Sequence, residues 1–289
     1  MNNLKPIQKV SNSPMVSMGP IRLRQPIPNV GIENVDPFLL LHHYGPYAIS
    51  AFNNPFDLGP HPHRGFEPIT LLFKGEQFHR DSLGNEMVVK AGDVQWTTAG
   101  RGIVHAEAPT KEFVERSGDL EGIQLWLNLP AAKKMMTPNY QHIKSDDMPI
   151  FTNTDASIEV KIVAGKQGDL NGAAETQTDI NIYMIQTKGE GSISLTVPEN
   201  HNGALYLLQG EVLVNDEEEL RFNENQMTIF GQGGSEIAFE AKKESNLIFI
   251  SGEPFNEPIA QYGPYVMNTQ TEILEAMRDY QMGKMGYLY

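Results

Sequence analysis

Two short segments of the sequence, PHPHRGFE and HAE, contain residues that are well suited to bind a metal ion. In a strand, residues i and i+2 point to the same face, so His61 and His63 can present two imidazoles to one point. His105 and Glu107, which begin 42 residues after His63, have the same spacing. Three imidazoles and one carboxylate without sulfur suit Fe(II), Mn(II), Ni(II), Cu(II) or Zn(II). An octahedral ion with these four ligands keeps two positions for water, O₂ or a chelating substrate.

A second carboxylate competes with Glu107 for the place of the fourth ligand. Glu67 stands four residues after His63 and points to the same face if the strand is continuous. The spacing alone leaves both glutamates open as ligands.

The elements that must position these residues are short strands. They are rich in β-branched and aromatic residues, and glycines bound many of them. Strands at intervals of about 8–12 residues favour a sandwich or barrel over alternating βαβ units. The expected strands cover residues 68–73, 86–90, 93–98 and 123–129, followed by 157–163, 181–187, 192–197, 204–214, 226–230, 236–239 and 246–250. One helix is expected near the C-terminus, because Thr269 and Glu272 have capping-box spacing and Gly283 can end it.

The two sets of strands resemble a duplicated domain. The sequence LFKGE at residues 72–76 is followed 135 residues later by LLQGE. We therefore expect one domain over residues 1–138 and a second over 139–289, which ends in the helical tail. The same offset places no histidine pair in the second half, so that domain is predicted to be metal-free. His201 is expected to be a surface or loop residue there, and His79 is expected to be a surface residue of the first domain.

Composition and charge exclude several other functions. Lys and Arg number 22 against 36 Asp and Glu, for a net charge of −14, which argues against nucleic-acid binding. The lack of cysteine excludes disulfides, thiol catalysis and zinc–thiolate sites. No apolar run reaches the length of about 18 residues needed to span a membrane, and the N-terminus does not resemble a signal peptide. A soluble, cytoplasmic protein is expected.

Four segments closely resemble the pirin family: residues 60–67, 91–107, 124–130 and 252–258. The resemblance runs over nearly the whole chain. Pirins are bicupins, so it implies an all-β fold of two cupin domains (double-stranded β-helix or jelly-roll barrels) with a short C-terminal helix. Pirins bind a metal, usually iron, in the N-terminal cupin through three histidines and one glutamate. On this sequence those ligands match His61, His63, His105 and Glu107, which ranks Glu107 ahead of Glu67, although other cupins usually take their carboxylate from the position of Glu67.

The same resemblance implies a function. Several pirins show quercetinase activity, so we expect a metal-dependent dioxygenase that cleaves the ring of a flavonol such as quercetin with O₂, with Fe(II) as cofactor and Glu107 as general base. The alternative is a non-enzymatic, redox-sensitive iron protein that regulates a transcription factor or metabolic enzyme through a protein partner. A metal-dependent enzyme with another small substrate is a third reading. The sequence leaves the metal, the natural substrate and the oligomeric state open.

Overall fold

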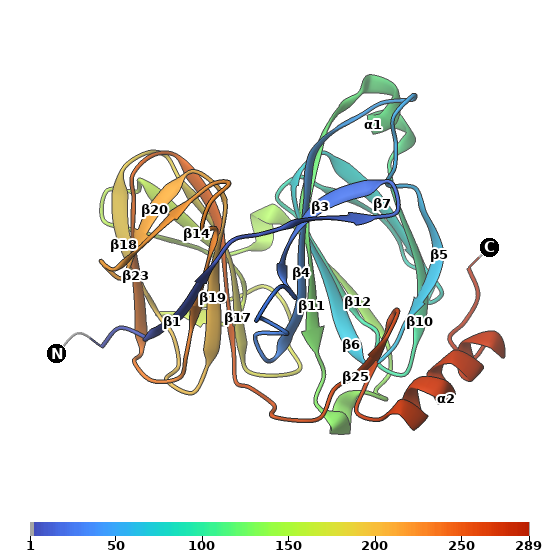
Figure 1. Ribbon diagram of the computed structural model, residues 1–289. Coiled ribbons are helices and arrows are strands. Elements are labelled where there is room, and N and C mark those ends of the chain that lie inside the picture. Colours follow the sequence, from blue (N-terminus) through green and yellow to red (C-terminus); the bar gives the residue numbers. More distant parts are fainter. Residues whose placement is uncertain (1–2, 289) are drawn as a thin grey trace. The chain divides into compact units, whose positions relative to one another are not determined.

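The structure is a computed structural model that describes residues 3–288, and within them it is built mainly of β-strands (Figure 1). The described chain forms two compact units, each with one seven-stranded and one four-stranded antiparallel sheet. This arrangement confirms the predicted all-β fold of two cupin barrels.

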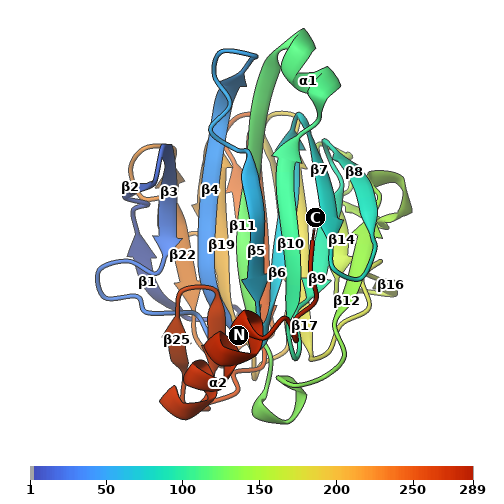
Figure 2. The same cartoon turned by 90° about the vertical axis from the view of Figure 1, so that its right-hand side faces the viewer.

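The unit that contains both histidine segments is here called the N-terminal barrel. It comprises Met15–Arg24, Phe38–Ser145 and the described residues from Phe255 onward. In spatial order its larger sheet consists of β12 (Asn139–Ile143), β9 (Val94–Thr98), β6 (Phe66–Lys74), β11 (Gly118–Asn128), β4 (Phe38–Ile49), β3 (Ile21–Ile27) and β2 (Met15–Met18). The smaller sheet consists of β5 (Leu58–His63), β10 (Ile103–Pro109), β7 (Glu76–Asp81) and β8 (Glu86–Lys90). Figure 2 shows the strands of this smaller sheet side by side.

The second unit is here called the C-terminal barrel. Its larger sheet consists of β1 (Ile7–Ser11), β22 (Met227–Phe230), β19 (Asn202–Gln209), β24 (Ser245–Gly252), β17 (Ile180–Thr187), β14 (Ile158–Ala164) and β13 (Ile150–Thr152). Its smaller sheet consists of β18 (Gly191–Thr196), β23 (Glu236–Ala241), β20 (Glu211–Val214) and β21 (Glu218–Arg221), and β15 (Lys166–Gln167) pairs with β16 (Leu170–Asn171). Successive side chains along each strand point to opposite faces of the sheet. The side chains that point inward fill the core, and they include Val160, Tyr183, Leu205, Leu247 and Phe249.

The two units are interleaved along the chain. Strand β1 pairs with β22, so the N-terminal segment belongs to the C-terminal barrel. The segment after Pro254 belongs to the N-terminal barrel, where the backbone N–H of Val266 donates to the carbonyl of Arg64 at 3.0 Å. This division differs from the expected single boundary at 138/139, because pairing between distant segments leaves no local signal in the sequence.

The C-terminal segment of the N-terminal barrel contains the hairpin of β25 (Ala260–Tyr262) and β26 (Tyr265–Met267) and the helix α2 (Gln270–Gln281). The predicted capping box is present: Thr269 Oγ1 accepts from the Glu272 N–H, and the Glu272 side chain accepts from the Thr269 N–H. The other α-helix of the described residues, α1 (Lys111–Arg116), is a short connection that the sequence analysis missed. Neither helix has the length and apolarity needed to cross a membrane, as far as residues 3–288 are concerned.

Candidate metal centre

The antiparallel pairing of β5 and β10 brings the two histidine segments together. In the register of these strands, His105 lies opposite His61. The ring centroids are 4.4 Å apart for His61 and His105, 4.8 Å for His63 and His105, and 5.0 Å for His61 and His63. One ligand atom of each ring lies within 4.8 Å of the other two. The i, i+2 spacing of His61 and His63 and the register of β5 against β10 together place three imidazoles around one point.

The environment of His63 and His105 favours the neutral imidazole, which is the form that binds metals. Burial, together with the neighbouring His61, lowers the pKa of His63 to about 3. Burial and the surrounding histidines also hold the pKa of His105 well below its ordinary value. His61 uses Nδ1 for a hydrogen bond with the Gly59 carbonyl at 2.9 Å, so its Nε2 remains for a ligand.

Buried ring nitrogens without partners show that these residues fit a metal ion. Both ring nitrogens of His105 lack a hydrogen-bond partner among the described residues, and so does Nε2 of His63. Both side chains are nevertheless buried. Leaving buried polar atoms unpaired costs free energy, and coordination of a cation would remove that cost. The donors His61, His63 and His105 would then hold the ion.

Glu107 lies beside this cluster at the other end of the HAE segment. Its carboxylate and one ring nitrogen each of His79 and His105 form a second group of possible ligands within 4.8 Å of one another. Gln95 Nε2 donates to Glu107 Oε1 and also to Thr70 Oγ1, the latter at 3.1 Å. The structure therefore brings Glu107 next to His105 with its side chain held by a neighbouring amide.

Glu67 occupies a different environment. Trp96 Nε1 donates to its Oε1 at 3.0 Å, and Thr98 Oγ1 donates to the same oxygen at 2.5 Å. Burial raises the pKa of Glu67 to about 7, and these two hydrogen bonds oppose the rise. Glu67 belongs to neither ligand group of the described chain, because Gly65 turns the backbone between β5 and β6 with a φ of +86°. The strand is not continuous, so the parity argument from His63 does not hold for Glu67.

Two histidines lie in places that the sequence analysis did not expect. His79 was expected at the surface but is fully buried, because it faces inward on β7 opposite Glu107 of β10. Its neighbour at i+2 is Asp81, so the same spacing rule that revealed His61 and His63 marks this pair. His201 was expected to be a surface or loop residue, and it lies in the loop just before β19. It is fully buried in the C-terminal barrel, where its Nδ1 lies 3.2 Å from Ser251 Oγ.

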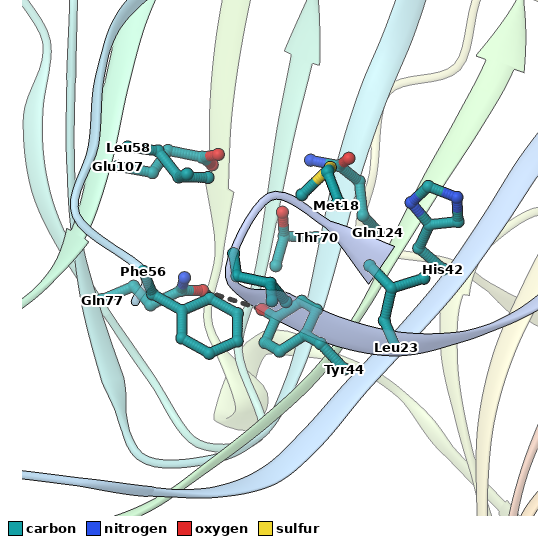
Figure 3. A pocket seen from close by; sticks show the side chains of 11 residues that line it. Met18, Leu23, His42, Tyr44, Phe56, Leu58, Thr70, Gln77, Glu107 and Gln124 are labelled. Carbon is teal, nitrogen blue, oxygen red and sulfur yellow. Dashed lines mark hydrogen bonds between the residues drawn. The ribbon is translucent and has the colours of Figure 1, made fainter. Parts of the chain in front are cut away.

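A small internal cavity of the N-terminal barrel adjoins Glu107 (Figure 3). Its volume is about 30 Å³. Tyr44 donates to Gln77 Oε1 at 3.0 Å in its wall, and burial lowers the pKa of His42 to about 4. The cavity combines an apolar side with several polar groups, and it is lined by Met18, Ile21, Leu23, His42, Tyr44, Phe56, Leu58, Thr70, Gln77, Glu107 and Gln124.

Fold and site together define a bicupin with a histidine-rich centre in one barrel. Comparison with family models agrees with this class: residues 21–127 match the pirin model, and residues 182–286 match the pirin C-terminal cupin domain. A pirin-like protein of Solanum lycopersicum is 35% identical over 266 residues, which cover 92% of this chain and 87% of the relative. The chain belongs to the pirin family.

Two solved structures extend the comparison. A structure of quercetin 2,3-dioxygenase from Acinetobacter baumannii is similar with a TM-score of 0.90 and 35% identity, and the match covers 99% of this chain and 100% of the other. The bacterial pirin YhhW from Escherichia coli, solved in complex with nickel(II), has a TM-score of 0.64 and 17% identity, over 87% of this chain and 100% of the other. The second likeness is one of fold alone.

Proposed function

We propose that this pirin is a metal-dependent dioxygenase that cleaves a flavonol such as quercetin with O₂. The observation that carries the proposal is the cluster of His61, His63 and His105 with the Glu107 carboxylate beside His105. Of these four residues, Glu107 also lines the internal cavity. The similarity to the Acinetobacter baumannii quercetin 2,3-dioxygenase over the full length supports this substrate class.

The proposed ligands are His61, His63, His105 and Glu107, and the proposed ion is Fe(II). The donor set also fits Mn(II), Ni(II), Cu(II) and Zn(II), and the nickel(II) complex of the Escherichia coli pirin agrees with a divalent transition metal in this fold. When bound, such an ion supplies Lewis acidity toward a substrate hydroxyl and the capacity to activate O₂.

The protein contributes a proton acceptor and an oriented pocket. Gln95 donates to Oε1 of Glu107, so Oε2, once released from the ion, would take the proton of the flavonol hydroxyl. A flavonol would reach the cavity only after its wall opens; apolar side chains such as Leu23 and Phe56 would then face the aromatic rings, while Gln77 and Gln124 would offer hydrogen bonds to ring hydroxyls. Leu58 and Glu107 also line an open surface groove of about 560 Å³, from which we propose that the substrate enters when Leu58 is displaced.

One observation favours a second candidate, the iron-binding regulator that acts through a protein partner. The internal cavity of about 30 Å³ has room for about one water molecule, whereas pockets for drug-sized ligands measure roughly 300–1,000 Å³. A redox-sensitive regulator needs the ligand cluster but no space for a flavonol.

Aerobic bleaching of quercetin separates the two candidates. We expect Fe(II)-loaded protein to consume quercetin faster than free Fe(II), and His63→Ala and His105→Ala to abolish this rate. Metal content is measured beside each rate, since these variants also lose a ligand. His142→Ala is the matched control, because His142 of β12 pairs with Asp93 and belongs to neither ligand group, and we expect this variant to retain activity. If the metal-loaded protein turns over several flavonols no faster than free Fe(II), the proposed dioxygenase activity is contradicted.

A further inference from the structure

The imidazole of His79 is held rigidly at the edge of the metal centre. Its Nε2 lies 3.1 Å from Asp81 Oδ2, and its ring stacks on Tyr140 with centroids 4.2 Å apart and an angle of 12° between the planes. The side chains of His79 and Asp81 are both fully buried. A buried histidine fixed on two sides has one defined ring orientation.

Asp81 determines which ring nitrogen of His79 carries the hydrogen. Its carboxylate accepts from the backbone N–H of Leu83 at 2.8 Å, and from the backbone N–H and Nδ2 of Asn85 at 3.1 and 2.8 Å. Such donors stabilise the ionised carboxylate, which can only accept hydrogen bonds. Nε2 of His79 is therefore the donor, and Nδ1 keeps its lone pair.

That lone pair has no hydrogen-bond partner in the part of the chain that the structure describes, although the atom is buried. Its surroundings contain the right neighbours for a cation, because a ring nitrogen of His79, a ring nitrogen of His105 and a carboxylate oxygen of Glu107 lie within 4.8 Å of one another. A histidine that donates one N–H to a carboxylate and directs the other nitrogen at a metal is a recurrent arrangement in metalloproteins.

We propose that His79 is a further nitrogen donor of the metal centre, which binds through Nδ1 to the ion shared with His105 and Glu107. The proposal rests on the proposed function in that a divalent transition metal occupies the centre. A fourth histidine beside His61, His63 and His105 reduces the number of positions open to exogenous ligands. It also makes Asp81 a positioning residue for a ligand.

Nitrogen NMR tests this assignment directly. Apoprotein labelled with ¹⁵N-histidine is titrated with Zn(II), a diamagnetic probe, and the ring nitrogens are followed in long-range proton–nitrogen spectra. We expect the His79 Nδ1 resonance to move together with those of His61, His63 and His105. The resonance is identified by its loss in His79→Gln, a variant of similar volume, with His79→Ala as the second variant.

Two further measurements complete the test. By competition with a chelator, we expect Asp81→Asn and His79→Gln to weaken Zn(II) binding by about 10–100-fold. His142→Ala is again the control, because it also removes a histidine from an Asp–His pair of this barrel. If the other three histidines shift while His79 Nδ1 keeps its metal-free position, the assignment of His79 is wrong and the proposed function stands. If none of the four shifts, the metal centre itself is refuted.

Discussion

Nη1 and Nη2 of Arg64 each lie 3.1 Å from Oδ2 of Asp279, so a residue adjacent to His63 is joined to helix α2, 215 residues later in the chain. The Arg64 guanidinium is buried, and its Nε donates to the Arg101 carbonyl at 2.6 Å. The C-terminal segment therefore holds the turn that follows the first histidine pair.

We expect Asp279→Asn to destabilise the apoprotein by about 2 kcal/mol, because it leaves the buried Arg64 cation unpaired while partial exposure of Asp279 moderates the cost. The metal affinity should fall as well, since the turn after His63 loses its support. Urea unfolding and a chelator competition measure the two effects. Lys284→Ala is the control, because Lys284 is half-exposed and bonds only the other oxygen of Asp279. Equal losses in both variants would contradict the prediction.

The purified protein should hold about one transition-metal ion per chain. Both groups of possible ligands in the described residues lie between His61 and Glu107, and they share His105, so they serve one ion. Elemental analysis after dialysis measures the ratio. Two firmly bound ions would show that the C-terminal barrel also has a site.

The two glutamates should differ in their effect on the metal. Glu107→Gln removes a proposed ligand and is expected to reduce bound metal strongly. Glu67→Gln keeps the hydrogen bonds from Trp96 and Thr98 within reach and should leave the metal bound. Metal content of both proteins, prepared side by side, gives the answer. Loss of metal in Glu67→Gln but not in Glu107→Gln would identify Glu67 as the carboxylate ligand.

Gln95 should matter for the metal centre without contacting the ion. Gln95→Leu removes the donor that holds Glu107 Oε1, and loss of such an outer partner typically costs about 10–100-fold in metal affinity or activity. Gln167→Leu is the matched control, because Gln167 is also buried but accepts from the Thr196 N–H in the C-terminal barrel. We expect the control to lose stability and to keep its metal affinity. Similar metal affinities in the two variants would argue against a role of Gln95.

Asp93 makes the stability of the N-terminal barrel depend on pH. Burial raises the pKa of its carboxyl, but hydrogen bonds from the Ser145 N–H, His142 and the Lys90 N–H outweigh this effect and bring the pKa below its ordinary value. Because its pKa is lowered, the ionised Asp93 stabilises the fold at pH values above the ordinary pKa of Asp. This contribution is lost as the pH falls through the pKa of Asp93 in the folded state.

We therefore expect Asp93→Asn to cost about 1 kcal/mol at pH 7, after allowance for solvent screening, and much less near pH 3. Urea unfolding of both proteins from pH 7 to pH 3 measures the difference. A cost that stays constant over this range would show that the effect comes from packing and not from the charge.

The sequence by itself determined the features that depend on local spacing. The pairs His61/His63 and His105/Glu107 follow the two-residue period of a strand, so their common faces are independent of the rest of the fold. Thr269 and Glu272 specify the start of α2 through bonds within one helical turn. The all-β class follows from the same short period and from the turn residues between strands.

Only the tertiary structure decided which distant residues meet. The turn at Gly65 interrupts the alternation of side chains between His63 and Glu67, so Glu67 bonds Trp96 and Thr98. Glu107 lies beside His105 instead. The register of β7 against β10 buries His79 beside the centre, and no spacing within β7 specifies that neighbour. The return of the C-terminal segment to Arg64 likewise depends on pairing across about 200 residues. Such contacts are set by the free energy of packing whole sheets, which local periodicity in a single sequence does not encode.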